Sequence, residues 1–261
     1  MMITKPSLAG RIAVVVLVAV GTTIPVTAQV STNDFTPPRL KDGHPNLQGL
    51  WRLYSKPGAV PTADGGPGDI FKGMEYLPAA AAKKKENLTK LRDDLVFQCV
   101  TASVPGATLY PPFPFLIVQD GKYVLIIYEY VHDVRIIPAD GSRHPDNFAA
   151  LNGDSRGHWE GDTLVVDVTN FDKIIRRQDM LGDFLDENEH AVERYTLIDP
   201  NTILYEVTVE DSTVLAKPWH VRTTLVRQPK DDRLLEHACR EGERDLPHYY
   251  QDDVPSERKG K

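Results

Sequence analysis

Short runs of β-branched and aromatic residues, separated by turn sequences, fill the chain from about residue 110 to residue 239. Asp120-Gly121 and Gly161-Asp162 each stand between two such runs, as turn dipeptides do in tight β-hairpins. Many short strands at this spacing, accompanied by a single helical segment, are typical of an antiparallel barrel or a strongly curved sheet. The pattern therefore predicts a mainly β protein, folded as a single antiparallel β-barrel of about eight or nine strands.

The predicted elements and boundaries follow from the same turn signals. The helix is expected over 78–95, because it opens with Pro78, continues with an alanine run and carries Leu88, Leu91 and Leu95 at helical spacing. Strands are expected at 49–51, 115–119, 122–131, 134–138, 163–168, 190–198, 202–209, 220–227 and 233–239. An arm with the first strand and a Gly/Pro-rich loop spans 29–75, the barrel domain spans 76–248, and a flexible tail spans 249–261.

The later predicted strands carry polar and apolar residues on opposite faces. Over 202–210, Tyr205 and Val207 alternate with Glu206 and Thr208. Two interpretations are open for this alternation. The polar face lies in water, or it lines a barrel lumen that combines apolar walls with a few polar groups, as small-ligand sites do.

The first 28 residues have the three parts of a secretory signal peptide. Lys5 and Arg11 supply the positive end, 12–20 is an apolar run, and Ala28 closes a stretch of small residues suited to cleavage. The apolar run is too short to cross a hydrocarbon layer of about 30 Å. We therefore expect a secreted or periplasmic protein after cleavage following Ala28, without a membrane span in its mature form.

Composition excludes some partners and cofactors. The formal charge of −7 at pH 7 and the sequence pI of about 5.6 argue against a nucleic-acid-binding protein, which needs a basic surface. The glycine-rich stretch 65–68 lacks the Lys-Ser/Thr and the helix of a phosphate loop, so no nucleotide or nicotinamide cofactor is expected. No metal is expected either. The open alternative is a metal site assembled from His132, His144, His158 and His190.

The chain has two cysteines, Cys99 and Cys239, and both lie beyond the predicted signal peptide. An oxidising compartment favours a disulfide between them, because one precedes the β-rich region and the other follows it. Such a bridge would close a long loop and stabilise the fold by roughly 5 kcal/mol in the chain-entropy model. Two buried thiols are the alternative.

The stretch GDSRGHWEGDTLVVDVTNF at 153–171 resembles a large family of secreted bacterial proteins, most of them uncharacterised. The resemblance extends over nearly the whole mature chain, at 42–43, 45–51, 128–129, 135–136, 140–145, 190–195, 218–219, Glu236 and Cys239. Gly49 and Trp51 are also similar to the first-strand motif of the lipocalins. The resemblance implies a calycin-like β-barrel and supports the Cys99–Cys239 pair, but it implies no reaction.

Glu129 stands near the end of a predicted strand that is otherwise apolar. It follows Tyr123, Leu125 and Ile127 at every second position, which predicts it on the apolar side of that strand. A carboxylate without water there suits general acid/base work, unless a cation pairs with it. Arg135 on the next strand either forms a buried ion pair with Glu129, or holds a substrate carboxylate or enolate beside it.

Two histidines are the other candidate acid/base groups. His144 lies in a loop directly before Pro145, which favours a rigidly held base, although an exposed loop histidine is the alternative. His190 opens a strand and shares one face with Arg194, whereas Glu193 points to the other face. His190 and Arg194 are therefore either an acid/base group with an anion clamp, or two residues on a solvated face.

The leading hypothesis is a cofactor-independent enzyme with acid/base chemistry of lyase, isomerase or cyclase type. It acts on a small, partly apolar substrate in a barrel pocket. The catalytic candidates are His144, His190 and Glu129, and the substrate-binding candidates are Arg135, Arg194, Tyr128, Trp159 and Trp219. A lipocalin-like periplasmic protein that binds a small molecule without converting it is the alternative, and a structural envelope protein is the third hypothesis. The sequence leaves the oligomeric state unspecified.

Overall fold

The computed structural model describes residues 35–53, 71, 73–90, 98–109, 113–174, 176–177 and 182–238. The chain divides into two compact units, Met1–Asn33 and Asp34–Lys261, and all described residues belong to the second unit. The predicted signal peptide, its cleavage point after Ala28 and the tail at 249–261 lie outside the described residues. Within the described part of the chain, no helix has the length and apolar character needed to cross a membrane.

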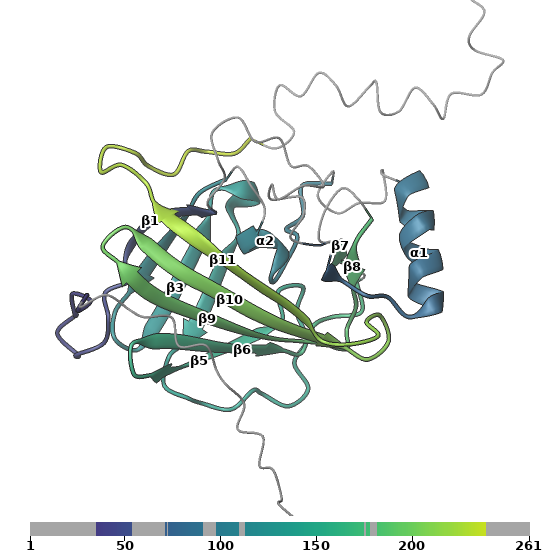
Figure 1. Cartoon of the computed structure of the whole chain (residues 1–261), viewed down its shortest axis with the longest axis horizontal. Coiled ribbons are helices and arrows are strands. Elements are labelled where there is room, and N and C mark those ends of the chain that lie inside the picture. The colour runs from purple at the N-terminus through teal and green to yellow at the C-terminus, as the bar shows by residue number, and fades with distance from the viewer. Residues whose placement is uncertain are drawn as a thin grey trace, which may run out of the picture. The chain divides into compact units, whose positions relative to one another are not determined.

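Nine strands form one antiparallel sheet, which curves round into a nearly closed barrel (Figure 1). Along the sheet, each strand is hydrogen-bonded to the next in the order β4-β3-β2-β1-β11-β10-β9-β6-β5. The strands are β1 (Gly49–Leu53), β2 (Phe115–Gln119), β3 (Tyr123–Tyr128), β4 (Val134–Pro138), β5 (Asp154–Glu160), β6 (Thr163–Thr169), β9 (Glu189–Asp199), β10 (Thr202–Asp211) and β11 (Trp219–Arg227). The predicted single antiparallel β-barrel is therefore confirmed.

Few other elements accompany the barrel. The helices are α1 (Pro78–Thr89) and α2 (Gly106–Leu109), and η3 (Tyr130–His132) is a short 3-10 turn. Two short strands, β7 (Arg176–Arg177) and β8 (Phe184–Leu185), form a separate two-stranded sheet. Helix α1 is tied to the chain just before β8, because the Asn87 side-chain amide donates to the carbonyl of Gly182 at 3.2 Å.

The barrel nearly closes where its two outermost strands, β4 and β5, approach each other. The amide of Gly141, just after β4, donates to the carbonyl of Gly157 in β5 at 2.9 Å. A Cβ atom at Gly157 would lie 3.0 Å from a methyl group of Ile137 and 3.3 Å from the carbonyl oxygen of Pro138. Glycine at this position therefore lets the two edges of the sheet come together.

The predicted turns form as expected. Gly161 and Asp162 connect β5 to β6 with only two residues, and Gly161 has a positive φ of +61°. The Asp120-Gly121 turn likewise joins β2 to β3. Strands β9, β10 and β11 follow one another as a meander, each paired with the next. Local turn chemistry and the two-residue period thus account for much of the barrel.

Three predicted element boundaries are wrong. The strand expected over 122–131 ends at Tyr128, because Val131 and His132 take left-handed conformations and form η3. The helix expected over 78–95 ends at Thr89, and Lys90 caps it. Residues 233–238 form no strand, since β11 already has β10 on one side and β1 on the other and offers them no free edge.

Trp51 and Arg227 connect β1 and β11, which are the first and last strands of the barrel along the chain and are paired with each other. The indole nitrogen of Trp51 donates to the carbonyl of Leu47 at 2.9 Å, and the guanidinium of Arg227 lies 4.1 Å from the centre of the Trp51 ring. Arg227 also donates to the carbonyl of Gln48 at 2.8 Å and to that of Pro200 at 2.9 Å. A buried indole beneath a bound cation combines apolar burial with a cation–π contact.

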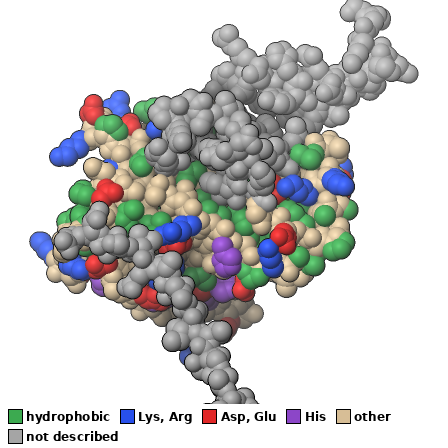
Figure 2. Space-filling view, viewed as in Figure 1, with side chains coloured by type: hydrophobic (Ala, Val, Ile, Leu, Met, Phe, Trp, Pro, Cys, Tyr) green, Lys and Arg blue, Asp and Glu red, His purple; other side chains and the backbone are tan. Residues whose placement is uncertain are grey.

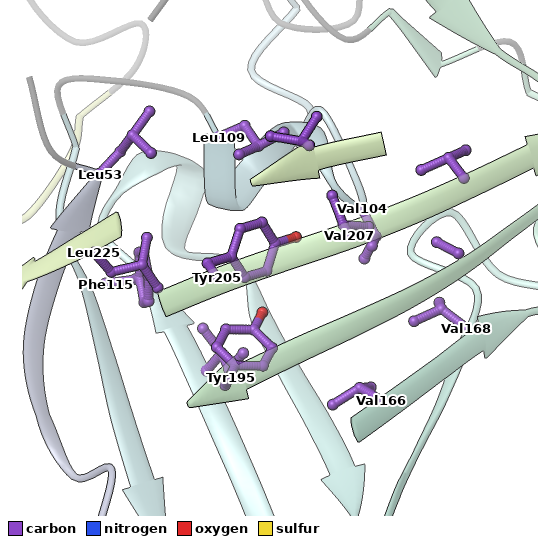
Figure 3. Packing of buried hydrophobic residues seen from close by; sticks show 14 of the residues in the cluster. Leu53, Val104, Leu109, Phe115, Val166, Val168, Tyr195, Tyr205, Val207 and Leu225 are labelled. Carbon is purple, nitrogen blue, oxygen red and sulfur yellow. The ribbon is translucent and has the colours of Figure 1, made fainter. Parts of the chain in front are cut away.

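The barrel interior is filled by alternating side chains from its strands. Tyr195 of β9 and Tyr205 of β10 lie side by side with their hydroxyls on the same side, and Leu109 of α2 lies near them (Figure 3). Their ring centres are 5.0 Å apart and tilted by 55°. The polar residues that alternate with Tyr205 and Val207 along β10, such as Glu206, point outward. For this strand the polar face is therefore the outer face, and the apolar face is the lumen.

The structure describes one of the two cysteines of the predicted disulfide. Cys99 is not a free thiol, and it has a positive φ of 62°. Cys239 lies outside the described residues. The pairing of the two cysteines therefore stays a prediction.

Candidate functional site

Glu129 does not form an ion pair with Arg135, which was one of the two alternatives left open by the sequence. Arg135 is buried in the barrel and forms its ion pair with Glu193 of β9, with its two terminal nitrogens 3.2 and 2.6 Å from the carboxylate oxygens. Glu129 lies just beyond the end of β3, where its carboxylate accepts the backbone N–H of Leu235 at 2.7 Å. The strand ends before Glu129. The face on which the alternation placed it, with Tyr123, Leu125 and Ile127, is the half-buried face of β3, and the residues between them are the buried ones.

The Arg135–Glu193 pair is the centre of a polar network inside the barrel. The hydroxyls of Tyr195 and Tyr205 both donate to one oxygen of Glu193, at 2.9 and 2.8 Å. Arg135 donates to the hydroxyl of Ser155 at 3.0 Å. Every member of this set is buried, so the network lies in a low-dielectric interior where each hydrogen bond is strengthened.

The electrostatics of this network favour an ionised pair. Burial raises the pKa of Tyr195 and of Tyr205 well above the usual range, so both hydroxyls stay protonated and act as donors. Burial opposes the charge of Arg135, but the Glu193 carboxylate more than offsets this and keeps the pKa of the guanidinium above its ordinary value. Glu193 thus accepts from three neighbouring side chains, and a substrate carboxylate at Arg135 would have to displace it.

A second polar cluster lies on the outer face of β5, β6 and β9. His144 has one ring nitrogen 2.6 Å from Asp154 of β5 and the other 2.8 Å from Asp167 of β6. The second oxygen of Asp167 lies 2.9 Å from Nε2 of His190 in β9. Two predicted catalytic residues, His144 and His190, are therefore brought together, by a carboxylate that they share. On the face seen in Figure 2, histidine side chains are exposed beside acidic and basic ones.

His144 fastens its loop to the sheet. Its two ring nitrogens face carboxylates on two different strands, Asp154 of β5 and Asp167 of β6. Arg156 of β5 completes the arrangement with two hydrogen bonds to Asp154, at 2.6 and 2.9 Å, and a third to Ser142 at 3.0 Å. Both ring nitrogens of His144 are thus already committed to protein partners.

His190 is held differently. Only its Nε2 is bonded to Asp167, and its side chain is 43% exposed, so a solute can reach the ring. The hydrogen bond to Asp167 raises the pKa of His190 above its ordinary value. The same bond, with a smaller contribution from His144, lowers the pKa of Asp167. Asp167 and His190 form a carboxylate–imidazole dyad with its histidine open to solvent.

We expect the imidazole of His190 to titrate above the usual histidine value of about 6.5. The Asp167–His190 pair stabilises the fold between the two pKa values. This stabilisation is lost as pH rises through the raised pKa of His190, and lost as pH falls through the lowered pKa of Asp167. Asp167→Asn should lower the His190 midpoint, measured by NMR of the ring C–H signals.

A matched control for this titration is Glu210→Gln. Glu210 faces His190 across β9 and β10 and acts on it only through space, as the smallest contribution to the shift. Its replacement should lower the His190 midpoint less than Asp167→Asn does. An unchanged midpoint in Asp167→Asn would show that the dyad is absent in solution.

The predicted substrate-binding residues do not meet in one place. Arg135 and Tyr128 lie together in the interior, with the Tyr128 hydroxyl 3.4 Å from the guanidinium. Arg194 points outward and donates to Glu160 at 2.9 Å. The other two candidates are the tryptophans: Trp159 stacks on His44 with ring centres 4.9 Å apart, and Trp219 packs on Phe71 with ring centres 5.5 Å apart.

The alternative four-histidine metal site does not form. His158 bonds to Glu160 on the outer face, and His132 accepts a backbone N–H from the chain after β11, so neither joins His144 and His190. In the part of the chain that the structure describes, no group of three or more His, Cys, Asp or Glu side chains is arranged to hold a metal ion.

Sequence reasoning missed two carboxylates. Asp167 joins His144 to His190 in the outer cluster, and Glu193 pairs with Arg135 in the interior. The alternation carried a usable signal for Glu193. It shares its strand face with Ala191, Tyr195 and Leu197, which are all buried, and a carboxylate on such a face needs a buried partner.

Comparison of the chain with known protein families, with curated proteins and with solved structures finds no match. The resemblance to a family of secreted bacterial proteins therefore stays a prediction.

Proposed function

We propose that this protein is a secreted or periplasmic enzyme with general acid/base chemistry of lyase, isomerase or cyclase type. The proton-transferring group is His190, and Asp167 is its carboxylate partner. The observation that supports this most directly is the hydrogen-bonded chain His144–Asp167–His190 on the outer face of β5, β6 and β9. The substrate is a small molecule bound over this face.

The dyad has the parts that proton transfer requires. Asp167 fixes the orientation of the ring and stabilises its protonated form, since it accepts a hydrogen bond at Nε2. The remaining nitrogen of His190 is the one that exchanges a proton with substrate. A histidine titrating near the operating pH is the usual group for such a step.

His144 has a different part in this proposal from the one predicted. Both of its nitrogens are engaged by Asp154 and Asp167, so it is a positioning residue that orients Asp167 and holds its own loop on the sheet. Glu129 has no part in the chemistry, since it lies at the end of β3 and binds the backbone of Leu235.

The site proposed here lies outside the barrel, whereas the sequence suggested a pocket in the lumen. The interior position beside Arg135 is occupied by Glu193 and its tyrosine donors. Two large apolar side chains, Phe148 and Ile174, are exposed on the segments flanking the end of β6. Those segments are joined by the bridge between Ala150 and Phe171, so they offer apolar contact for a partly apolar substrate.

The test begins with a screen of small metabolites against the purified protein, with both retention and conversion measured. For a converted compound, His190→Gln should lower kcat by about 10²–10⁴-fold, the usual contribution of a general acid or base. His220→Gln is the matched control, because His220 is an exposed outer-face histidine that bonds only to Thr208 in the described structure. Equal turnover by His190→Gln and the wild type would overturn the proposal.

A lipocalin-like carrier is the second candidate function, and one observation favours it. The N–H groups of Arg135 Nε and Trp219 Nε1 are buried in the interior without a hydrogen-bond partner among the described residues. Buried donors of this kind are available to a ligand that brings acceptor atoms. The same screen separates the two functions, since a carrier retains a compound without converting it and keeps this binding in His190→Gln.

A further inference from the structure

The chain after β11 (yellow in Figure 1) turns back and binds the turn at η3. We call Leu235–His237 the C-terminal strap. Three backbone N–H groups hold the strap and the turn together, and the acceptor of each is a titratable side chain. Leu235 donates to Glu129 at 2.7 Å, His237 donates to Nε2 of His132 at 3.2 Å, and Val131 donates to Nδ1 of His237 at 3.4 Å.

The two histidine contacts are reciprocal. The strap supplies an N–H to a ring on the turn, and the turn supplies an N–H to a ring on the strap. Each ring nitrogen can accept only while it carries no proton. Protonation converts both acceptors into N–H donors that point at backbone N–H donors, which breaks the contacts.

The turn beneath the strap is in an unfavourable conformation. Val131 has φ 50° and ψ 18°, and His132 has φ 56°, so two consecutive non-glycine residues are left-handed. For a β-branched residue such as Val131 this conformation is rare and needs outside contacts to hold it. The bond from its own N–H to His237 is one such contact, and it is lost if the strap leaves.

Aromatic packing seats the His237 ring. Its centre lies 5.0 Å from that of Phe113 and 4.9 Å from that of Tyr130. These contacts hold the ring in place against the turn, although the residues on both sides of His237 are exposed.

We propose that the C-terminal strap is a pH-sensitive clamp on one end of the barrel, closed when His132 and His237 are neutral and released when they are protonated. The clamp is intact while both rings are neutral and is lost on acidification. The turn directly follows Tyr128 of β3, which bonds to Thr108 of α2 at 2.8 Å. Release therefore loosens the barrel where β3 meets α2.

The turn and the strap contain charged and titratable groups besides His132 and His237. Glu129 supplies the third strap contact, in which its carboxylate accepts the backbone N–H of Leu235. Asp133 is already bound by the side-chain amide of Asn152 at 2.9 and 2.8 Å. Tyr130 belongs to the turn, Glu236 is the middle residue of the strap, and Arg233 precedes the strap; Glu236 and Arg233 are exposed. His132 and His237 are thus the groups whose contacts are reversed from acceptor to donor by protonation.

Amide hydrogen exchange measured by NMR tests this clamp, which does not depend on the proposed function. Between about pH 7.5 and about pH 5, the N–H groups of Val131 and His237 should lose about tenfold more protection than that of Val207, after correction for intrinsic exchange. Val207 lies in the middle of the β9–β10–β11 meander and reports opening of the whole barrel.

The matched variant is His132→Gln with His237→Asn. Glutamine and asparagine place amide oxygens near Nε2 and Nδ1 and accept hydrogen bonds without titrating. This variant should keep its strap protection at about pH 5, while His220→Gln should lose it as the wild type does. The proposal is overturned if wild-type Val131 and His237 follow Val207, or if the double variant loses protection as the wild type does.

Discussion

Replacement of Arg135 by alanine is expected to lower the free energy of unfolding by about 3–5 kcal/mol, measured by urea denaturation near neutral pH. The physical reason is the charge that remains. Glu193 is completely buried, and without Arg135 its donors are the hydroxyls of Tyr195 and Tyr205. An uncompensated carboxylate in a protein interior is far more costly than the loss of a hydrogen bond.

The expected loss exceeds that of any surface pair because solvent cannot reach this one. Side chains of Arg135 and Glu193 are 2% and 0% exposed. Arg222 and Glu206, on the outer face of β10 and β11, are 53% and 38% exposed and lie 3.1 Å apart. Arg222→Ala is therefore the matched control, and it should change the stability by less than about 1 kcal/mol.

The two variants together make the interpretation of Arg135 testable. If Arg135→Ala costs no more than Arg222→Ala, water reaches Glu193 and the interior network is not a closed one. If the loss is large but Tyr195→Phe produces the same loss, the network depends on the tyrosine donor as much as on the ion pair. We expect Tyr195→Phe to cost about 1 kcal/mol, the usual value for one hydrogen bond.

The parts of the fold that were predicted from the sequence are the local ones. A two-residue turn at Gly161-Asp162 and alternation along β9 and β10 depend on residues that are neighbours in the chain. Turn residues and alternation can be recognised in a sequence without knowledge of the rest of the molecule. The end of β3 could not be predicted, because no residue type around Val131 indicates a left-handed turn there.

The long-range contacts of the candidate site were the part that could not be predicted. Arg135 and Glu193 are 58 residues apart, and they meet because barrel closure brings β4 and β9 to opposite sides of one lumen. Alternation along β9 placed Glu193 on the opposite face from His190. It did not indicate which other strand lies across the lumen from Glu193. Glu129 was aligned with Tyr123, Leu125 and Ile127, which form the half-buried face of β3, and the strand ends before it reaches Glu129.

The outer cluster shows the same division. His144 and His190 were each recognisable as candidates from their positions in the sequence. Their connection depends on the register of β6 against β9, in which Asp167 lies opposite Val192, two residues from His190 and on the same face. Register is decided by burial of the whole sheet, so a shared carboxylate becomes visible only when the strands are paired.

Gly49→Ala is expected to destabilise the protein by about 2–4 kcal/mol, the second large effect. Gly49 has φ +140°, which side chains other than glycine rarely adopt. A Cβ atom would also lie 2.1 Å from a terminal nitrogen of Arg227. Arg227 would have to leave the Trp51 ring and the carbonyl of Gln48, so the substitution disrupts the contact between β1 and β11.

Two comparisons separate the backbone effect from the contact with Arg227. Gly161→Ala has a positive φ of +61° and no atom within 4 Å of the added Cβ, so it should cost about 1–2 kcal/mol, from backbone strain alone. In a background of Arg227→Ala, Gly49→Ala should cost less than it does in the wild type, since the side chain in its way is gone. Additive losses in this cycle, measured by chemical denaturation, would show that the guanidinium moves aside freely. A positive coupling would establish that Gly49 is required because Arg227 binds across it between β1 and β11.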